Sequence, residues 1–300
     1  MRPFAALLVA ACLALQARAQ ARAPALTNGG LPSASPDGMH VAFWSNREGS
    51  WQVYVLRDDG TDLRRLSQGA GLAPSVLTWT RDGARVVFSS SQGDTARVFA
   101  VSLNGEPPRV IGRVIGHSPA LTPDEHHLIC SAGTFPFVRL SISDLNGANA
   151  RPITDDRSGA FNATFAPDGR SIAYSRLDSA NKIAVWLMNG DGSSARQVSH
   201  IDETEGGAQW PAWSPDGRSL AIQVSKSNRQ DHSQDVSHIW VIDLATNNSR
   251  RLTSHTQPYL DETPSWFPDG QRIVFQSNRT GRMEIWLMNA DGSGARQLTQ

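Results

Sequence analysis

Polar side chains occupy one recurring position in four of six similar segments of the sequence. They are Ser75, His117, Gln209 and Glu262, while Gly30 and Phe161 take the same position in the other two segments. If the start of each segment lines the mouth of one channel, these positions face one another. A hydroxyl, an imidazole, an amide and a carboxyl group arranged in this way can hydrogen-bond a ligand. We therefore predict that these positions form the rim of a binding site.

Two further residues extend the predicted rim. Asp261 directly precedes Glu262, and Trp210 directly follows Gln209 at the place of Thr263 in the last segment. The Trp210 indole suits an exposed anchor for a protein partner or a sugar ring, with packing in the core as the alternative. The predicted binding residues are Ser75, His117, Gln209, Trp210, Asp261 and Glu262.

The short motifs of common catalytic sites are absent from the sequence. It contains no G-x-S-x-G nucleophile turn, no phosphate-binding loop and no dinucleotide fingerprint. We therefore assign no catalytic residue and expect a protein that is not an enzyme. The alternative is a hydrolase or lyase acting on a polysaccharide or peptide through His117, Gln209 and Glu262.

Acidic residues near the predicted rim raise the question of a bound cation. Carboxylate oxygens are the ligands that calcium prefers. Five acidic residues lie in neighbouring segments: Asp202, Glu203, Glu205, Asp261 and Glu262. No loop, however, has the spacing of a dedicated calcium motif. The sequence therefore predicts no metal and no cofactor, with a bound calcium ion as the alternative.

Histidines offer a second possible metal site. His232 and His238 lie close in sequence to Asp231 and Asp235, and these residue types bind zinc. No spacing typical of a tetrahedral site is present. We therefore expect the histidines to be solvated surface residues.

The elements that must position all of these residues recur along the chain. Each unit contains a tight-turn signature around an aspartate: Asp37, Asp82, Asp124, Asp168, Asp216 and Asp269. Successive aspartates are 45, 42, 44, 48 and 53 residues apart, a period typical of propeller blades. Proline and glycine in these signatures favour a type I turn followed by a left-handed residue. Glu125 replaces the glycine in the third unit, where we expect strain or a different turn.

Regular apolar runs follow each turn. Four residues after every aspartate comes an apolar triplet, such as Val41-Ala42-Phe43 or Leu128-Ile129-Cys130, and such a run indicates a strand covered on both faces. We expect Cys130 to be a buried hydrophobic residue. A third strand and a short fourth strand complete most units. The pattern predicts an all-β fold, a six-bladed β-propeller with four antiparallel strands per blade.

The repeat resembles that of a known family. Trp213-Ser214-Pro215-Asp216-Gly217, followed by Ile239-Trp240-Val241 and Arg251-Leu252-Thr253, is similar to the WD-type repeat of the TolB family. The resemblance implies a six-bladed propeller and a role like that of TolB in the periplasmic Tol–Pal system. TolB proteins carry an α/β domain before the propeller, whereas here the first unit begins near residue 27, so we expect a free-standing propeller. Prolyl-oligopeptidase-type peptidases share the repeat but add a C-terminal hydrolase domain, for which the sequence up to Gln300 leaves no room.

The first residues have the layout of a secretory signal peptide. Arg2 precedes an apolar run from Phe4 to Leu15, and Ala17-Arg18-Ala19 offers a cleavage site. We therefore predict a signal peptide over residues 1–19 and the propeller over residues 20–300. A buried helix and lipidation at Cys12 are the alternatives. Ala25-Leu26-Thr27 resembles a fourth-strand ending, and we expect this piece to pair with a blade at the other end of the chain.

These observations together limit the classes of function. The 28 basic and 28 acidic residues balance, so nothing favours nucleic acid as a partner, and no later segment is apolar enough to cross a membrane. We predict a monomeric, periplasmic or secreted scaffold that binds a protein or peptide of the cell envelope. The alternatives are the enzyme described above and a glycan-binding module that uses Trp210.

Overall fold

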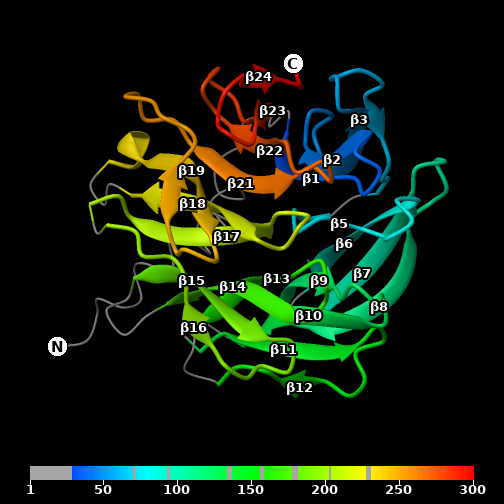
Figure 1. Cartoon of the computed structure of the whole chain (residues 1–300). Coiled ribbons are helices and arrows are strands. Elements are labelled where there is room, and N and C mark those ends of the chain that lie inside the picture. Colours follow the sequence, from blue (N-terminus) through cyan, green and yellow to red (C-terminus); the bar gives the residue numbers. More distant parts are fainter. Residues whose placement is uncertain are drawn as a thin grey trace.

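Six four-stranded antiparallel sheets surround a common axis in the computed structural model (Figure 1). The structure describes residues 29–69, 72–92, 95–133, 137–155, 159–177, 182–202, 204–227 and 231–300. Each sheet uses four strands that are consecutive in the chain, and we number these sheets blades 1 to 6. The described helical structure is one 3-10 turn, His232–Gln234. The predicted all-β, six-bladed propeller with four antiparallel strands per blade is confirmed.

The strands have the following bounds. Blade 1 contains β1 (Gly30–Ala34), β2 (His40–Ser45), β3 (Gln52–Arg57) and β4 (Arg64–Arg65). Blade 2 contains β5 (Thr78–Trp79), β6 (Arg85–Gln92), β7 (Thr95–Ser102) and β8 (Arg109–Ile115). Blade 3 contains β9 (His117–Leu121), β10 (His127–Ala132), β11 (Arg139–Asp144) and β12 (Arg151–Pro152). Blade 4 contains β13 (Ala160–Phe165), β14 (Ser171–Leu177), β15 (Ile183–Asn189) and β16 (Arg196–Gln197). Blade 5 contains β17 (Gly207–Trp213), β18 (Ser219–Lys226), β19 (Val236–Asp243) and β20 (Ser249–Arg251). Blade 6 contains β21 (Asp261–Trp266), β22 (Arg272–Ser277), β23 (Glu284–Asn289) and β24 (Arg296–Gln297).

The repeated aspartates cap the turn between the first and second strands of every blade. Each carboxylate accepts a hydrogen bond of 2.8–3.0 Å from the backbone N–H two residues later. Such Asx turns stabilise the sharp reversal that the flanking strands require. In blade 3, Glu125 adopts φ +60° in place of glycine and its N–H still donates to Thr122, at 2.8 Å. The turn is therefore conserved in shape, and Glu125 carries the left-handed strain that the sequence predicted.

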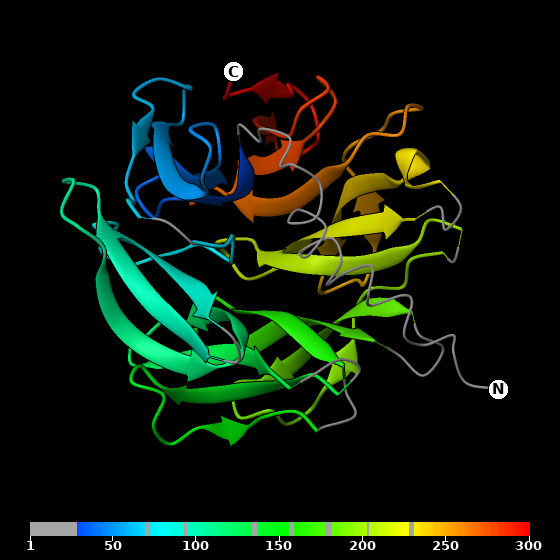
Figure 2. The same ribbon diagram turned by 180° about the vertical axis from the view of Figure 1, so that it is seen from behind.

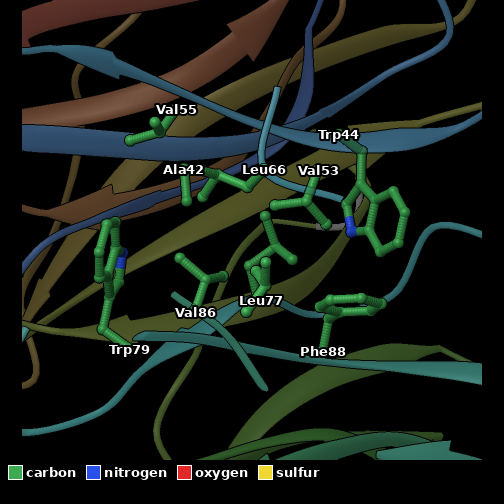
Figure 3. Packing of buried hydrophobic residues seen from close by; sticks show 10 residues of the cluster. Ala42, Trp44, Val53, Val55, Leu66, Leu77, Trp79, Val86 and Phe88 are labelled. Carbon is green, nitrogen blue, oxygen red and sulfur yellow. The ribbon is translucent and has the colours of Figure 1, made fainter. Parts of the chain in front are cut away.

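Apolar side chains from neighbouring blades form six separate cores. Each core joins one blade to the next, for example blade 1 to blade 2 through Trp44, Leu66, Trp79 and Phe88 (Figure 3). The Trp44 and Phe88 rings meet edge to face, with centroids 5.3 Å apart, a geometry that adds about 0.5–1.5 kcal/mol to simple burial. Because every sheet is covered on both faces, the apolar triplet of its second strand is buried, as the sequence indicated. Cys130 is buried in the core between blades 2 and 3, as predicted.

The ring closes where blade 6 packs against blade 1, and the two ends of the described chain lie side by side in both views (Figures 1 and 2). Val41 and Phe43 share a core with Phe267 and Val274. Arg272 adds an ion pair to Asp58 at 2.7 Å. Every sheet of the described chain takes its strands from one continuous stretch, so side-chain packing closes the ring there, together with a backbone hydrogen bond of 3.1 Å from Gly29 to the Met283 carbonyl. Ala25-Leu26-Thr27, for which we predicted strand pairing, and residues 1–19 lie outside the described residues.

Candidate functional site

The two ends of the propeller differ in the length of their connections. At one end, which we call the turn face, five residues always join the first strand to the second, and five or six join the third to the fourth. At the other end, the rim face, two to nine residues join the second strand to the third, and one to twelve join consecutive blades. The first strand of each blade starts at the rim face. The predicted rim residues therefore lie at the end of the molecule where the connections vary.

The strand register places the six predicted rim positions at equivalent sites. Each position is opposite, or bonded to, the residue fourteen places later in the second strand of its own blade. These pairs are Gly30 with Trp44, Ser75 with Ser89, His117 with Ser131, Phe161 with Ser175, Gln209 with Gln223, and Glu262 with Gln276. The alignment made from the sequence is therefore structurally correct.

A β-bulge follows five of these positions, and in blades 1, 5 and 6 it turns a backbone N–H toward the preceding blade. The bulge residues have positive φ: Leu31, Ser118, Asn162, Trp210 and Thr263. The N–H of Thr263 donates to Gln223 at 3.2 Å, and that of Leu31 to Gln276 at 2.7 Å. Polar side chains next to the rim positions thus satisfy the donors that the bulges free, and they join adjacent blades.

Glu262 is the centre of a buried hydrogen-bond network at the junction of blades 5 and 6. Its carboxylate accepts hydrogen bonds from Gln276 at 2.9 Å, Gln223 at 3.2 Å and Ser237 at 3.3 Å. Glu262 is 8 % exposed, and burial raises its pKa above the usual value because the charged form loses solvation. The carboxylate of Glu262 is therefore already bound by groups of the fold.

Asp261 lies beside this network and contacts a different set of groups. Its Oδ1 accepts a hydrogen bond of 2.6 Å from Arg279, and its Oδ2 lies 3.4 Å from Nε2 of His255. The His255 ring stacks on that of His238, with centroids 4.3 Å apart. Asp261 is fully buried and the His255 side chain is 11 % exposed. Two imidazoles, a carboxylate and a guanidinium thus converge where β19, β21 and the connection between β20 and β21 meet.

Burial and charge shift the titration of these groups in different directions. Burial, with the neighbouring His255, lowers the pKa of His238 to about 4. Burial alone would raise the pKa of Asp261, but His255 and Arg279 outweigh it and hold the pKa below its usual value. Burial alone would lower the pKa of His255, but Asp261 and the carbonyl of Gln257 raise it. The carboxylate of Asp261 therefore stays charged at neutral pH.

The other predicted rim residues are placed as follows. The Ser75 hydroxyl donates to the Ser89 carbonyl at 2.9 Å and is used within its own blade. Gln209 is buried, and Trp210 is half-buried and lies outside the six apolar cores. His117 begins β9, and its side chain lies outside the part of the structure that is described. The geometry therefore brings Asp261 and Glu262 together at one junction and leaves Trp210, like Phe161 of blade 4, as a half-buried aromatic residue of the rim.

Several groups at this junction were missed by sequence reasoning. His238 and His255 were interpreted as solvated residues, but both rings are half-buried and contact each other. The side chain of His232, which the sequence analysis placed in the same possible metal site, lies outside the described part of the structure. One feature of the sequence could have indicated the hydrogen-bond network around Glu262. Gln223 and Gln276 carry amides at a position where the second strands of the other blades have serine or tryptophan.

The structure also contains a cavity that is separate from the rim. A cavity of about 300 Å³ lies between blades 2 and 3, lined by Val87, Ile111 and Leu121, but Thr80 and Arg85 place it at the turn face. It is therefore remote from the rim.

Within the described ranges, no helix has the length and apolar character needed to cross a membrane.

Comparisons with known proteins agree with the propeller fold. A sequence model described as the TolB beta propeller domain matches residues 134–300. The uncharacterized protein Atu1656 of Agrobacterium fabrum is 31% identical over 135 residues, which cover 45% of this chain and 42% of that protein. Dipeptidyl-peptidase 5 of Porphyromonas gingivalis is 25% identical over 277 residues, covering 90% of this chain and 40% of the peptidase. The chain thus spans about two fifths of the length of these relatives. The crystal structure of TolB from Acinetobacter baumannii superposes with a TM-score of 0.67 at 18% identity, covering 90% of this chain and 62% of that one; this similarity shows the fold.

Proposed function

We propose that this chain, which belongs to the family of TolB β-propeller domains, is an exported scaffold that binds a protein or peptide partner at its rim face. The proposal includes a signal peptide over residues 1–19, a propeller over residues 20–300, and a location in the periplasm or cell envelope. No metal or cofactor takes part in this binding.

The difference between the two faces carries the proposal. Short turns of nearly constant length, capped by aspartates, leave the turn face uniform from blade to blade. The rim face varies in connection length and composition, and binding residues concentrate on variable loops held by a rigid scaffold. A ring of six such connections gives a broad surface on which an extended or folded partner can dock.

Within this face, Trp210 is the residue best suited to anchor a partner. It is half-buried, lies outside the apolar cores, and is held by the bulge of β17 with φ +53°. A rigidly held aromatic side chain loses little conformational freedom on binding, and such residues supply much of the energy of protein interfaces.

The state of Glu262 favours binding over catalysis. A general acid or base must be within hydrogen-bond reach of a substrate proton, but the Glu262 carboxylate already accepts three hydrogen bonds from the fold. His117, its counterpart in the enzyme alternative, belongs to blade 3 and Glu262 to blade 6, three blades apart in a ring of six. We therefore favour the scaffold over the hydrolase or lyase.

Site-specific photo-crosslinking in the native envelope tests the proposal. A photoreactive phenylalanine analogue replaces Trp210 in one strain and Arg218 in another; Arg218 is exposed in the turn face of the same blade. We expect one discrete covalent adduct from position 210 and none from position 218. Equal labelling from both positions, or no adduct at 210 in a folded protein, would contradict a partner site on the rim face.

Fractionation of cells that express the tagged full chain tests the location. We expect the protein in the periplasmic or secreted fraction, shortened by the length of the predicted signal peptide. An unprocessed protein in the cytoplasm would contradict export, and lipid labelling that disappears in the Cys12→Ser variant would indicate the lipoprotein alternative.

A further inference from the structure

Three buried polar atoms that make no hydrogen bond of normal geometry lie at the junction of blades 5 and 6, and two of them, Nε2 of His255 and Oδ2 of Asp261, are 3.4 Å apart. The third is Nδ1 of His238. One ligand atom from each of these side chains lies within 4.8 Å of those from the other two. Buried polar atoms are nearly always satisfied, so a cluster that lacks such bonds indicates a missing ligand.

Neighbouring groups orient two of these atoms toward the shared space. Nδ1 of His255 lies 2.8 Å from the carbonyl oxygen of Gln257, which can only accept a hydrogen bond, so the Nδ1 proton is directed there and Nε2 faces the cluster. Oδ1 of Asp261 is occupied by Arg279 at 2.6 Å, which leaves Oδ2 for the cluster. Such outer contacts are those that fix the tautomer and orientation of metal ligands.

The backbone holds the three side chains together without help from a ligand. The N–H of Ser237 donates to the Tyr259 carbonyl at 3.1 Å, and Ser237 forms a parallel bridge with Leu260. At the other end of the same connection, Ile239 donates to the Thr253 hydroxyl at 3.0 Å. The segment that carries His255 is therefore fastened on both sides to β19, which carries His238.

We propose that His238, His255 and Asp261 form a binding site for a divalent transition-metal ion of the zinc class. Two imidazole nitrogens and one carboxylate oxygen are a ligand set that such ions accept, and three protein ligands leave a coordination position open. Tetrahedral zinc requires its ligand atoms to lie about 3.3 Å apart, so the three atoms, which lie within 4.8 Å of one another here, must move closer when the ion binds. This site extends beyond the proposed binding scaffold and does not depend on the identity of its partner.

The arrangement of charge indicates an exchangeable ion rather than one that the fold requires. Arg279 compensates the buried carboxylate of Asp261 in the absence of a metal, and its guanidinium is stacked 4.6 Å from the Trp286 ring. Blade 1 repeats this arginine as Arg47 but has Gly29 at the position of Asp261. The arginine thus occurs in two blades, whereas the His-His-Asp cluster belongs to this one junction.

Titration of the chelator-treated, untagged full chain with Zn²⁺ tests the proposal, with a chromophoric chelator as competitor. We expect one Zn²⁺ per chain at this site, and an affinity at least about tenfold lower in His238→Ala and in His255→Ala, since even the loss of an outer contact lowers affinity about 10–100-fold. His127→Ala is the matched control, because His127 also lies near two carboxylates, Asp124 at 3.6 Å and Asp144 at 3.8 Å, but its side chain is 43 % exposed, against 11 % for His255. The control should bind Zn²⁺ as the unaltered protein does.

Two results would overturn the proposal. One is a Zn²⁺ affinity that is the same in the unaltered protein and in the folded His238→Ala and His255→Ala variants, which would mean that a proton alone occupies the cluster. The other comes from X-ray absorption on the unaltered protein with one equivalent of Zn²⁺, a measurement that needs no variant to fold. We expect the signature of two imidazoles, and a zinc shell with fewer would refute the site.

Discussion

Replacement of Glu262 by glutamine should destabilise the fold although the two side chains have nearly the same shape. The carboxylate accepts hydrogen bonds from Gln276, Gln223 and Ser237, whereas an amide has one acceptor oxygen and one donor group. If the amide oxygen faces Gln223 and Ser237, its NH₂ group faces the NH₂ group of Gln276. The Gln276 amide cannot flip to compensate, because its oxygen accepts the N–H of Leu31 in blade 1 at 2.7 Å.

The magnitude follows from the number of unsatisfied groups. At least one buried donor loses its acceptor in Glu262→Gln, which costs about 1–3 kcal/mol. The raised pKa of Glu262 shows that its charge is penalised by burial, and removal of the charge offsets part of this loss. We expect the lost hydrogen bonds to outweigh that gain, and the melting temperature to fall by roughly 2–5 °C for a chain of this size.

Urea unfolding followed by tryptophan fluorescence measures the change in unfolding free energy. Glu48→Gln is the matched control, because Glu48 pairs with Arg65 at the exposed surface and such pairs contribute about 0–1 kcal/mol. In a double-mutant cycle with Gln276→Leu, we expect a coupling energy of at least about 0.5 kcal/mol. A Glu262→Gln variant as stable as the unaltered protein, or a coupling energy near zero, would refute the network that we describe.

Three further predictions test the turns and the cores. Gly192 and Gly49 have similar φ values of +92° and +90°, but an added Cβ meets the Ile153 carbonyl only at Gly192. Gly49→Ala should therefore lower the unfolding free energy by about 1–2 kcal/mol, and Gly192→Ala should lower it clearly more. Thermal unfolding measures both changes, and equal losses of stability would contradict the contact. Burial raises the pKa of the Cys130 thiol to about 11, so only about 0.1 % is thiolate at pH 8. Iodoacetamide should therefore label Cys130 in the unfolded but not in the native protein, and rapid labelling of Cys130 in the native protein would show an accessible thiol. Hydrogen bonds from the Ser214 hydroxyl and the Arg218 N–H lower the pKa of Asp216, although burial opposes them. The Asp216 carboxylate therefore stabilises the fold above its unfolded-state pKa, and this stabilisation is lost as pH falls through the lower folded-state pKa. Asp216→Asn should flatten the dependence of stability on pH in acid unfolding, and an unchanged profile would argue against this linkage.

Most of the fold was predictable because its determinants are local and repeated. The turn around each aspartate depends on residues within a few positions, and the left-handed residue after it is evident even where Glu125 replaces glycine. Apolar triplets report burial on both faces of a strand, and six copies with a similar period allow few architectures other than a propeller. Even the equivalence of the rim positions followed from the alignment of the units.

The candidate site was only partly predictable because its contacts cross between blades. Asp261 and Glu262 are adjacent in sequence, but alternate residues of a strand face opposite sides, and each carboxylate meets different neighbours. Glu262 is bound by Gln223, 39 residues away in blade 5, and Asp261 by Arg279 and His255. No spacing in the sequence connects His238 with His255, so the cluster was missed.

The amino-acid sequence by itself determined the strands, the turns and the number of blades, since each depends on interactions within one unit of some forty to fifty residues. Only the tertiary structure decided which polar groups are bound by the fold and which are left without a hydrogen bond of normal geometry. The physical reason is that burial and hydrogen bonding at the rim are properties of two blades in contact, and closure of the ring sets the distance between them. Glu262 was thereby assigned to the internal network of the fold, and His238, His255 and Asp261 to a cluster that remains open for a ligand.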